Sequence, residues 1–211
     1  MKDTSIVESG QSVTTQGPEQ LETVKVWDPF LRLFHWALAI CVTAAWILGE
    51  FGPDVMTLHF WFGYAVLGLL AFRLLWGLVG PEHARFRNFA YGPVSLVRYL
   101  RNMLKRKPSY WPGHNPVGGL FVFVILGIVL VQAVSGLFVD PEDYINVGPL
   151  AGTVDTETAR AALSLHNSVT TLLLAIVVLH VAAIVFYARW KNEDLVRPML
   201  TGRKTVRKDL E

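Results

Sequence analysis

Four long apolar runs set what this chain can fold into. They extend from about Leu33 to Leu48, Thr57 to Val79, Pro116 to Val139 and Ala161 to Trp190. Each is near the roughly 20 residues that a helix needs to cross a bilayer, although the first is short unless Phe30 and Phe51 extend it. Lipid offers an open backbone no hydrogen-bond partner, so we expect four helices. A hydrophobic share of 52% also indicates a membrane protein.

The basic residues gather at one end of these spans. Seventeen of nineteen Lys and Arg residues precede the first span, lie between 80 and 114, or follow from Arg189 onward. The 140–160 connection holds Arg160 alone among five acidic residues. Cytoplasmic loops are enriched in Lys and Arg. The sequence therefore predicts an all-α, four-helix transmembrane bundle whose N and C termini are both cytoplasmic.

The polar segments outside the spans complete the expected organisation. Residues 1–24 are rich in Ser, Thr, Gln and Glu and are expected to form a disordered cytoplasmic tail. Residues 25–205 form the transmembrane domain, and 206–211 form a second cytoplasmic tail. The net charge of +2 does not suggest a nucleic-acid partner. The single cysteine, Cys41, cannot form an internal disulfide or an iron–sulfur cluster and is expected to pack.

The stretch GPVSLVRYLRNMLKRK, within the 80–114 connection, has the pattern of an amphipathic helix. Its apolar positions Val97, Leu100 and Leu104 fall on one helical face, and Arg98, Arg101 and Lys105 fall on another. Such a helix suits the anionic inner leaflet of a membrane. A solvated basic loop is the alternative interpretation.

Two histidines, His166 and His180, interrupt the apolar stretch LHNSVTTLLLAIVVLHV. Ionisable side chains inside a membrane helix are costly and mark function by default. Their separation corresponds to about 21 Å of helix rise and nearly whole turns, so both rings project the same way at two depths. His35 begins the first span near the depth of His180. His59 begins the second span near the depth of His166.

Two histidines at each depth predict two haem sites. Paired imidazoles from facing helices supply the two axial ligands of a haem iron, and the interior of a four-helix bundle can hold such cofactors. Two ligands at each point are too few for a zinc or copper site. A hydrogen-bonded interior histidine explains one such residue but not four matched in depth. We therefore expect His35 with His180, and His59 with His166, to ligate two non-covalently bound haems.

Other residues near the spans have two interpretations each. Arg73 lies at the depth of His35 and His180, where it either pairs with a haem propionate or snorkels to the inner interface. Arg32, three residues before His35, could also meet a propionate. Glycines inside or near the spans fit either a porphyrin face or a close helix contact; they are Gly49, Gly63, Gly68, Gly77, Gly127 and Gly136.

Two more histidines lie outside the spans on the expected cytoplasmic side. His114, in GHNPVGG, could contact a propionate or carry a proton at a quinone site. We favour capping and packing at the start of the third span. His83 is expected in a solvated loop.

Several stretches resemble the bacterial cytochrome b561 family, whose superfamily includes the b-type cytochrome subunits of nickel–iron hydrogenases. They are VWDPFLRLFHW, LHFWFGYAVLGLLAFRLLWGLVGP, GHNPVGG and LHNSVTTLLLAIVVLHVAA, and the resemblance covers about residues 24–205. It implies that two b haems are bound by His35, His59, His166 and His180. These are the same four histidines that the matching of depths within the membrane selects. It also implies a multi-pass protein of the bacterial inner membrane that exchanges electrons with quinone.

The main functional hypothesis is a dihaem b-type cytochrome that transfers electrons across the membrane, to or from quinone. Two axial histidines leave an iron no open position for oxygen. A second hypothesis is a membrane-anchor cytochrome b subunit of a periplasmic oxidoreductase such as a hydrogenase, with the acidic 140–157 loop as a docking surface. A non-redox transporter and a structural scaffold are more remote. The expected partners are membrane lipid, the quinone pool and a periplasmic oxidoreductase or cytochrome c; a homodimer is left open.

Overall fold

The computed structural model describes residues 21–54, 56–106, 111 and 113–207. Four long helices dominate it: α1 (Pro29–Phe51), α2 (Thr57–Val79), α4 (Pro116–Gly136) and α5 (Thr156–Trp190). The shorter elements are β1 (Leu21–Lys25), η1 (Glu82–Ala84), η2 (Phe86–Asn88), α3 (Pro93–Met103), η3 (Ala151–Thr153), α6 (Val196–Thr201) and β2 (Arg203–Arg207). The four long helices are long and apolar enough to cross a membrane, as the apolar runs predicted.

Helix α1 is longer than predicted at both ends. Its N-cap, Asp28, accepts hydrogen bonds from the backbone N–H groups of Phe30 and Leu31 at 3.0 and 3.1 Å. Proline at the first helical position suits this start, because its fixed φ is already helical. The predicted start at Leu33 was therefore four residues late. Helix α2 has the predicted bounds.

The last two long helices also differ from their predicted limits. Helix α5 begins at Thr156, five residues before the predicted Ala161, because Asp155 caps it by accepting from the Thr158 N–H at 2.8 Å. Helix α4 ends at Gly136 rather than Val139. The residues after it pair instead with the outgoing loop, where the Gly148 N–H donates to the Val139 carbonyl oxygen at 2.7 Å.

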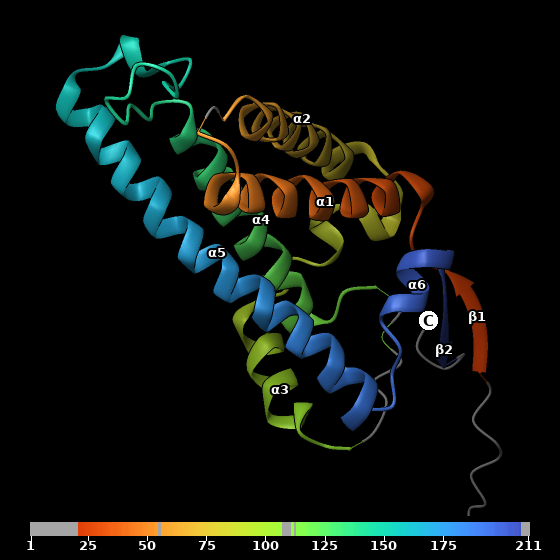
Figure 1. The fold of residues 1–211 in the computed structure, drawn as a ribbon. Coiled ribbons are helices and arrows are strands. Elements are labelled where there is room, and N and C mark those ends of the chain that lie inside the picture. The colour runs from red at the N-terminus through yellow and green to blue at the C-terminus, as the bar shows by residue number, and fades with distance from the viewer. Residues whose placement is uncertain (1–20, 55, 107–110, 112, 208–211) are drawn as a thin grey trace, which may run out of the picture.

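The long helices form two hairpins. Helix α1 packs on α2, and α4 packs on α5, while α2 and α4 join the hairpins. Figure 1 shows the α1–α2 hairpin running across the α4–α5 hairpin. A core of Val66, Leu70, Val129 and Leu173 joins α2, α4 and α5, and Cys41 packs against it as expected. Most apolar side chains point outward instead, as in helices that face lipid.

The predicted amphipathic helix is present as α3. Its Val97, Leu100 and Leu104 side chains are exposed. On the inner face, the Tyr99 hydroxyl hydrogen-bonds the Tyr187 hydroxyl of α5 at 2.7 Å. The helix is therefore held against α5 while an apolar edge is left uncovered. Its contact with lipid stays a prediction.

A two-stranded antiparallel sheet was not predicted. Strand β1 pairs with β2, with Leu21 opposite Arg207 and Lys25 opposite Arg203. The assignment of residues 21–24 to a disordered tail is therefore wrong, and so is that of 206 and 207 to a C-terminal tail. The two strands are too far apart in sequence for a hairpin pattern to reveal them. Residues 1–20 and 208–211, predicted as tails, lie outside the described residues.

Gly202 connects α6 to this sheet in a conformation that suits glycine. Its φ is +81°, in the left-handed region. A Cβ there would lie 2.6 Å from the Trp27 carbonyl oxygen. The Gly202 carbonyl in turn accepts from the Val26 N–H at 2.9 Å, so this close approach ties the two ends of the described chain together.

A buried ion pair holds the sheet against the helical hairpins. The Lys204 ammonium lies 2.8 Å from the Glu193 carboxylate, with the side chains only 8% and 6% exposed. Lys204 also donates to the Trp111 carbonyl oxygen at 2.7 Å. A second pair, Arg160 with Glu142, has the same 2.8 Å separation but is 65% and 58% exposed. Only the buried pair is expected to matter for stability.

Replacing Lys204 with Met should lower the free energy of unfolding by about 3 kcal/mol, because the cation beside a buried carboxylate is lost. The apparent melting temperature in detergent, followed by circular dichroism, should fall by roughly 6–12 °C. Arg160→Met is the matched control and should cost less than about 1 kcal/mol. Equal effects in the two variants would contradict the distinction.

Candidate functional site

The four predicted histidines meet in two pairs. The rings of His35 (α1) and His180 (α5) have centroids 6.4 Å apart, and those of His59 (α2) and His166 (α5) have centroids 6.1 Å apart. Each pair joins one helix of the α1–α2 hairpin to α5. The histidines that were paired by depth are therefore neighbours in the structure, and their role as haem ligands stays a prediction.

The spacing within each pair suits a metal bound between two imidazoles. Metal–imidazole bonds are about 2 Å long, and a ring nitrogen lies roughly 1 Å from the ring centre, so two rings on opposite sides of one metal have centres about 6 Å apart. Among the described residues, no group of three or more His, Cys, Asp and Glu could hold a metal ion. A cofactor that supplies its own equatorial nitrogens fits such two-ligand sites.

Backbone carbonyls set the tautomers of one pair. Nδ1 of His59 lies 2.8 Å from the Ala45 carbonyl oxygen, and Nδ1 of His166 lies 3.0 Å from that of Gln132. A carbonyl oxygen only accepts, so each Nδ1 carries the proton and each Nε2 keeps its lone pair. Metal-binding histidines have this arrangement, because the outer hydrogen bond fixes the ring and its tautomer.

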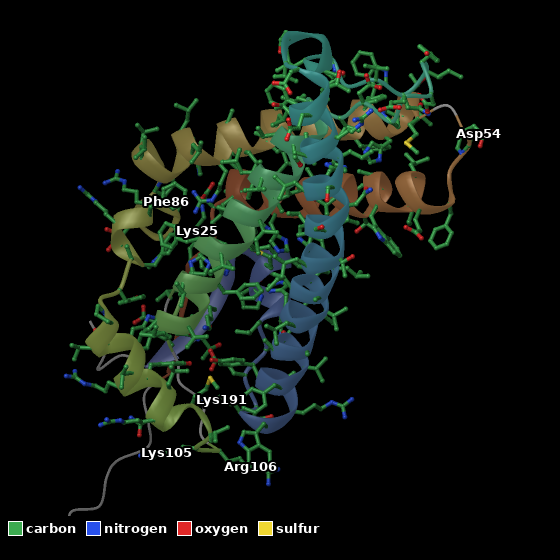
Figure 2. The ribbon with its side chains drawn as sticks, turned by 90° about the vertical axis from the view of Figure 1, so that its left-hand side faces the viewer. Lys25, Asp54, Phe86, Lys105, Arg106 and Lys191 are labelled. Atoms are coloured by element: carbon green, nitrogen blue, oxygen red, sulfur yellow. The ribbon has the colours of Figure 1, made fainter. Side chains whose placement is uncertain are left out.

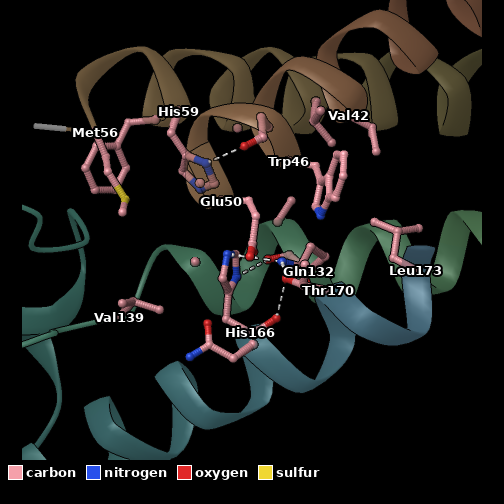
Figure 3. Close-up of a pocket in the computed structure, with 18 of the residues that line it drawn as sticks. Val42, Trp46, Glu50, Met56, His59, Gln132, Val139, His166, Thr170 and Leu173 are labelled. Atoms are coloured by element: carbon pink, nitrogen blue, oxygen red, sulfur yellow. Dashed lines mark hydrogen bonds between the residues drawn. The ribbon is translucent and has the colours of Figure 1, made fainter. Parts of the chain in front are cut away.

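A cavity of about 710 Å³ surrounds His59 and His166. Figure 3 shows the two rings facing one another across it, with Trp46 and Gln132 nearby. The Gln132 side-chain nitrogen is 3.1 Å from His166 Nε2 and donates to the Thr170 hydroxyl at 2.8 Å. The lining is otherwise mostly apolar, and the volume lies within the range typical of cofactor sites.

Aromatic rings flank the other pair. Phe121 of α4 stacks on His180, with centroids 5.4 Å apart and planes 12° apart. Trp36 meets His35 edge-on at 5.2 Å. His35 Nδ1 is buried without a hydrogen-bond partner in the described structure.

The predicted glycines divide into three groups. A Cβ on Gly49 would lie 3.2 Å from the His59 ring, and one on Gly136 would lie 3.0 Å from the His166 ring, so these glycines make room for the imidazoles. Gly77 packs under Phe86, which is a close contact within the protein. A Cβ on Gly63, Gly68 or Gly127 would meet nothing within 4 Å. Close helix packing therefore does not explain these last three glycines; of the three, Gly63 lines the cavity, whereas Gly68 and Gly127 are exposed.

Arg73 is buried in the protein, with only 2% of its surface exposed. Its guanidinium carbon lies 4.3 Å from the centre of the Phe86 ring, and one terminal nitrogen, Nη1, has no hydrogen-bond partner in the described structure. Asp28 is close enough to interact with it electrostatically. Of the two interpretations left open for Arg73, this burial disfavours the snorkelling one.

Part of the Arg32 guanidinium is already hydrogen-bonded within the protein. Its Nη1 donates to the Leu200 carbonyl oxygen at the end of α6, whereas its Nε is buried without a partner. Trp36, one turn further along α1, donates to the neighbouring Met199 carbonyl at 3.4 Å. Arg32 therefore anchors α6, and its buried Nε remains for a further anion.

His114 packs as expected between two aromatic rings. Its ring centroid lies 4.7 Å from that of Trp27 and 4.6 Å from that of Phe89. Burial, and then the nearby Arg73 charge, lower the pKa of His114 to about 3. The side chain is therefore neutral at physiological pH. The capping role expected here belongs instead to Asn115, which accepts from the Gly118 N–H at 2.8 Å.

Sequence reasoning missed several residues of these sites. His83, assigned to a solvated loop, is half-buried beside Gly113. Glu50 and Gln132 line the cavity but were not selected. Gln132 is a polar residue within an apolar span, and that signal could have identified it. Phe86 could not be identified from the sequence, because the loop after α2 brings it to Arg73 and no sequence pattern predicts that contact.

Comparison with known proteins agrees with this geometry. The family model described as prokaryotic cytochrome b561 matches residues 26–202. A Rhodobacter capsulatus protein named "Probable Ni/Fe-hydrogenase B-type cytochrome subunit" is 24% identical, with 90% of this chain and 87% of the relative covered. An Azotobacter vinelandii protein of the same name is 28% identical, over 56% of this chain and 62% of the relative.

Histidine replacement tests the pairing. His35→Ala and His180→Ala should each remove the same haem absorption component, because either change deletes one of its two iron ligands. His59→Ala and His166→Ala should each remove the other. His83→Ala, outside both pairs, is the control and should keep both components in reduced-minus-oxidised spectra. Loss of one shared component in His35→Ala and His59→Ala would show that the pairs are wrong.

Proposed function

This chain belongs to the prokaryotic cytochrome b561 family, and we propose that it is a dihaem cytochrome that carries electrons across the cytoplasmic membrane, to or from quinone. Family membership establishes the coarser statement: the protein is a membrane-bound b-type cytochrome with a role in electron transfer. The number of haems, their ligands and the quinone are our proposal.

The two facing histidine pairs carry this proposal. In it, His35 and His180 hold one b haem and His59 and His166 hold the other. A haem iron supplies one-electron redox chemistry. Two histidines would hold each haem, which would then exchange electrons rather than bind oxygen. The apolar helices around them exclude water. The 14-residue interval between His166 and His180 separates the two sites along α5 by about 21 Å.

We assign the His35–His180 site to the cytoplasmic side and the His59–His166 site to the periplasmic side. Figure 2 supports this assignment, since the labelled Lys105, Arg106 and Lys191 gather at one end of the molecule and Asp54 lies far from them. An excess of Lys and Arg favours the cytoplasmic face. Both termini and the 80–114 connection then lie in the cytoplasm of a bacterial cell, at its inner membrane.

A membrane-anchor subunit of a periplasmic oxidoreductase is the second candidate function. The similar proteins from Rhodobacter and Azotobacter are named as cytochrome subunits of Ni/Fe-hydrogenase, which favours this assignment. The two candidates share the same haem sites and differ only in the electron donor. Co-purification of the tagged chain with a large periplasmic oxidoreductase subunit would support the membrane-anchor function.

Cofactor content is the direct test of the dihaem proposal. Purified protein should contain two b haems per chain, extractable without bond cleavage, because Cys41 is the only cysteine and a covalent haem motif needs two. The pyridine haemochrome assay against protein concentration measures this ratio. One haem or none per chain would overturn the proposal. A non-redox transporter would also lack the sharp α band in a reduced-minus-oxidised spectrum.

Arg73→Leu tests the proposed pairing of Arg73 with a propionate. Reduction adds an electron, so a nearby cation favours the reduced iron. Its loss should lower the midpoint potential of the His35–His180 haem by roughly 60 mV, a tenfold change in the one-electron equilibrium. The other haem should change little. Redox titration of variant and wild type measures both, and Arg98→Leu, which changes an exposed residue of α3, is the control. Unchanged potentials in Arg73→Leu would exclude the propionate role.

A further inference from the structure

Charge is distributed unequally around the two histidine pairs. Among the described residues, the cavity at His59 and His166 is lined by the carboxylates of Glu50 and Asp143, with no Lys or Arg in its wall. Figure 3 shows Glu50 of α1 among the labelled side chains that line this cavity, together with His59 and His166. This cavity therefore carries negative charge without a cation in its lining.

The Asp143 charge is held by its own loop. The backbone N–H groups of Asn146 and Ile145 donate to one carboxylate oxygen at 2.8 and 2.9 Å, and the Asn146 amide donates to the other at 2.7 Å. These bonds keep the pKa of Asp143 below its ordinary value. Arg160, the one basic residue of the 140–160 connection, forms its ion pair with Glu142 instead.

Two arginines lie near the start of α1 and the end of α2, on the helices that lead to the other pair. Arg73 is buried next to the Phe86 ring and keeps one nitrogen without a partner in the described structure. Arg32 lies one turn before His35 on α1 and keeps its Nε without one. Asp28 offsets part of the Arg73 charge. The charges named at this end are therefore two arginines and one acid, whereas the cavity wall has two acids and no cation.

We infer that Glu50 lowers the midpoint potential of the haem held by His59 and His166, so that the His35–His180 haem is the stronger electron acceptor. A carboxylate near an iron opposes the electron that reduction adds, whereas a guanidinium favours it. Electrons then pass more readily from the acidic site to the basic one. This inference rests on the proposed dihaem function, and Glu50 acts on the iron through space rather than as a ligand.

Redox titration of Glu50→Gln in the full-length protein tests this role. The midpoint potential of the His59–His166 haem should rise by about 60 mV, a tenfold change in its one-electron equilibrium. The His35–His180 haem should stay within a small fraction of that shift. The His59→Ala spectrum identifies which component belongs to which site. Asp54→Asn, an exposed acid beyond the end of α1 and outside the cavity wall, should change neither potential.

Two further variants keep the test decisive. Glu50→Asp keeps the charge and should keep a potential near that of wild type. Asn167→Asp adds a carboxylate to the cavity wall with little change in shape and should lower the same potential. If the Glu50→Gln protein does not bind this haem, the change in midpoint potential caused by Asn167→Asp still measures how a carboxylate in the cavity acts on the iron. No shift in either Glu50→Gln or Asn167→Asp, or equal shifts at both haems, overturns the inference. A protein without two haems overturns the proposed function instead.

Discussion

Both proposed sites depend on pairs of imidazole rings that meet inside apolar helices, with centroids 6.4 and 6.1 Å apart. At His59 and His166, backbone carbonyls accept the Nδ1 protons, so each Nε2 keeps its lone pair, and the Gln132 amide nitrogen lies 3.1 Å from that of His166. In the proposed function, a haem iron held by each pair would bond to the neutral form of both rings, so that no charged imidazole would lie in lipid.

Helix packing leaves space around these rings rather than filling it. The crossing hairpins meet tightly at Val66, Leu70, Val129 and Leu173, and this core separates the two histidine sites along α5. On the side of His59 and His166, small residues leave room: Gly49 and Gly136 admit the rings, whereas Gly63 has open space beside it. The core stabilises the crossing of the hairpins, and the crossing in turn sets the distance within each pair.

The sequence predicted features that depend on helical period and apolar length, and it missed those made by chain reversals. The spans and the four histidines followed from hydropathy, helix rise and spacing. The N-caps Asp28 and Asp155 could have been identified from the sequence but were not, so two helices were predicted to begin too late. Strands β1 and β2 could not be predicted from their spacing, because their pairing is set by contacts between the two ends of the described chain. Phe86 was missed for the same reason.

The loops at the proposed cytoplasmic end explain why Arg73 can remain buried. A guanidinium this deep in a span would ordinarily extend toward water along the helix surface. Here the chain turns back after α2 and places Phe86 over Gly77, where any side chain on residue 77 would collide with that ring. Phe86 thereby covers Arg73 and contacts it through a cation–π interaction. The guanidinium is therefore held inside the protein by a loop whose position depends on one glycine, and its charge acts on the interior rather than on the lipid.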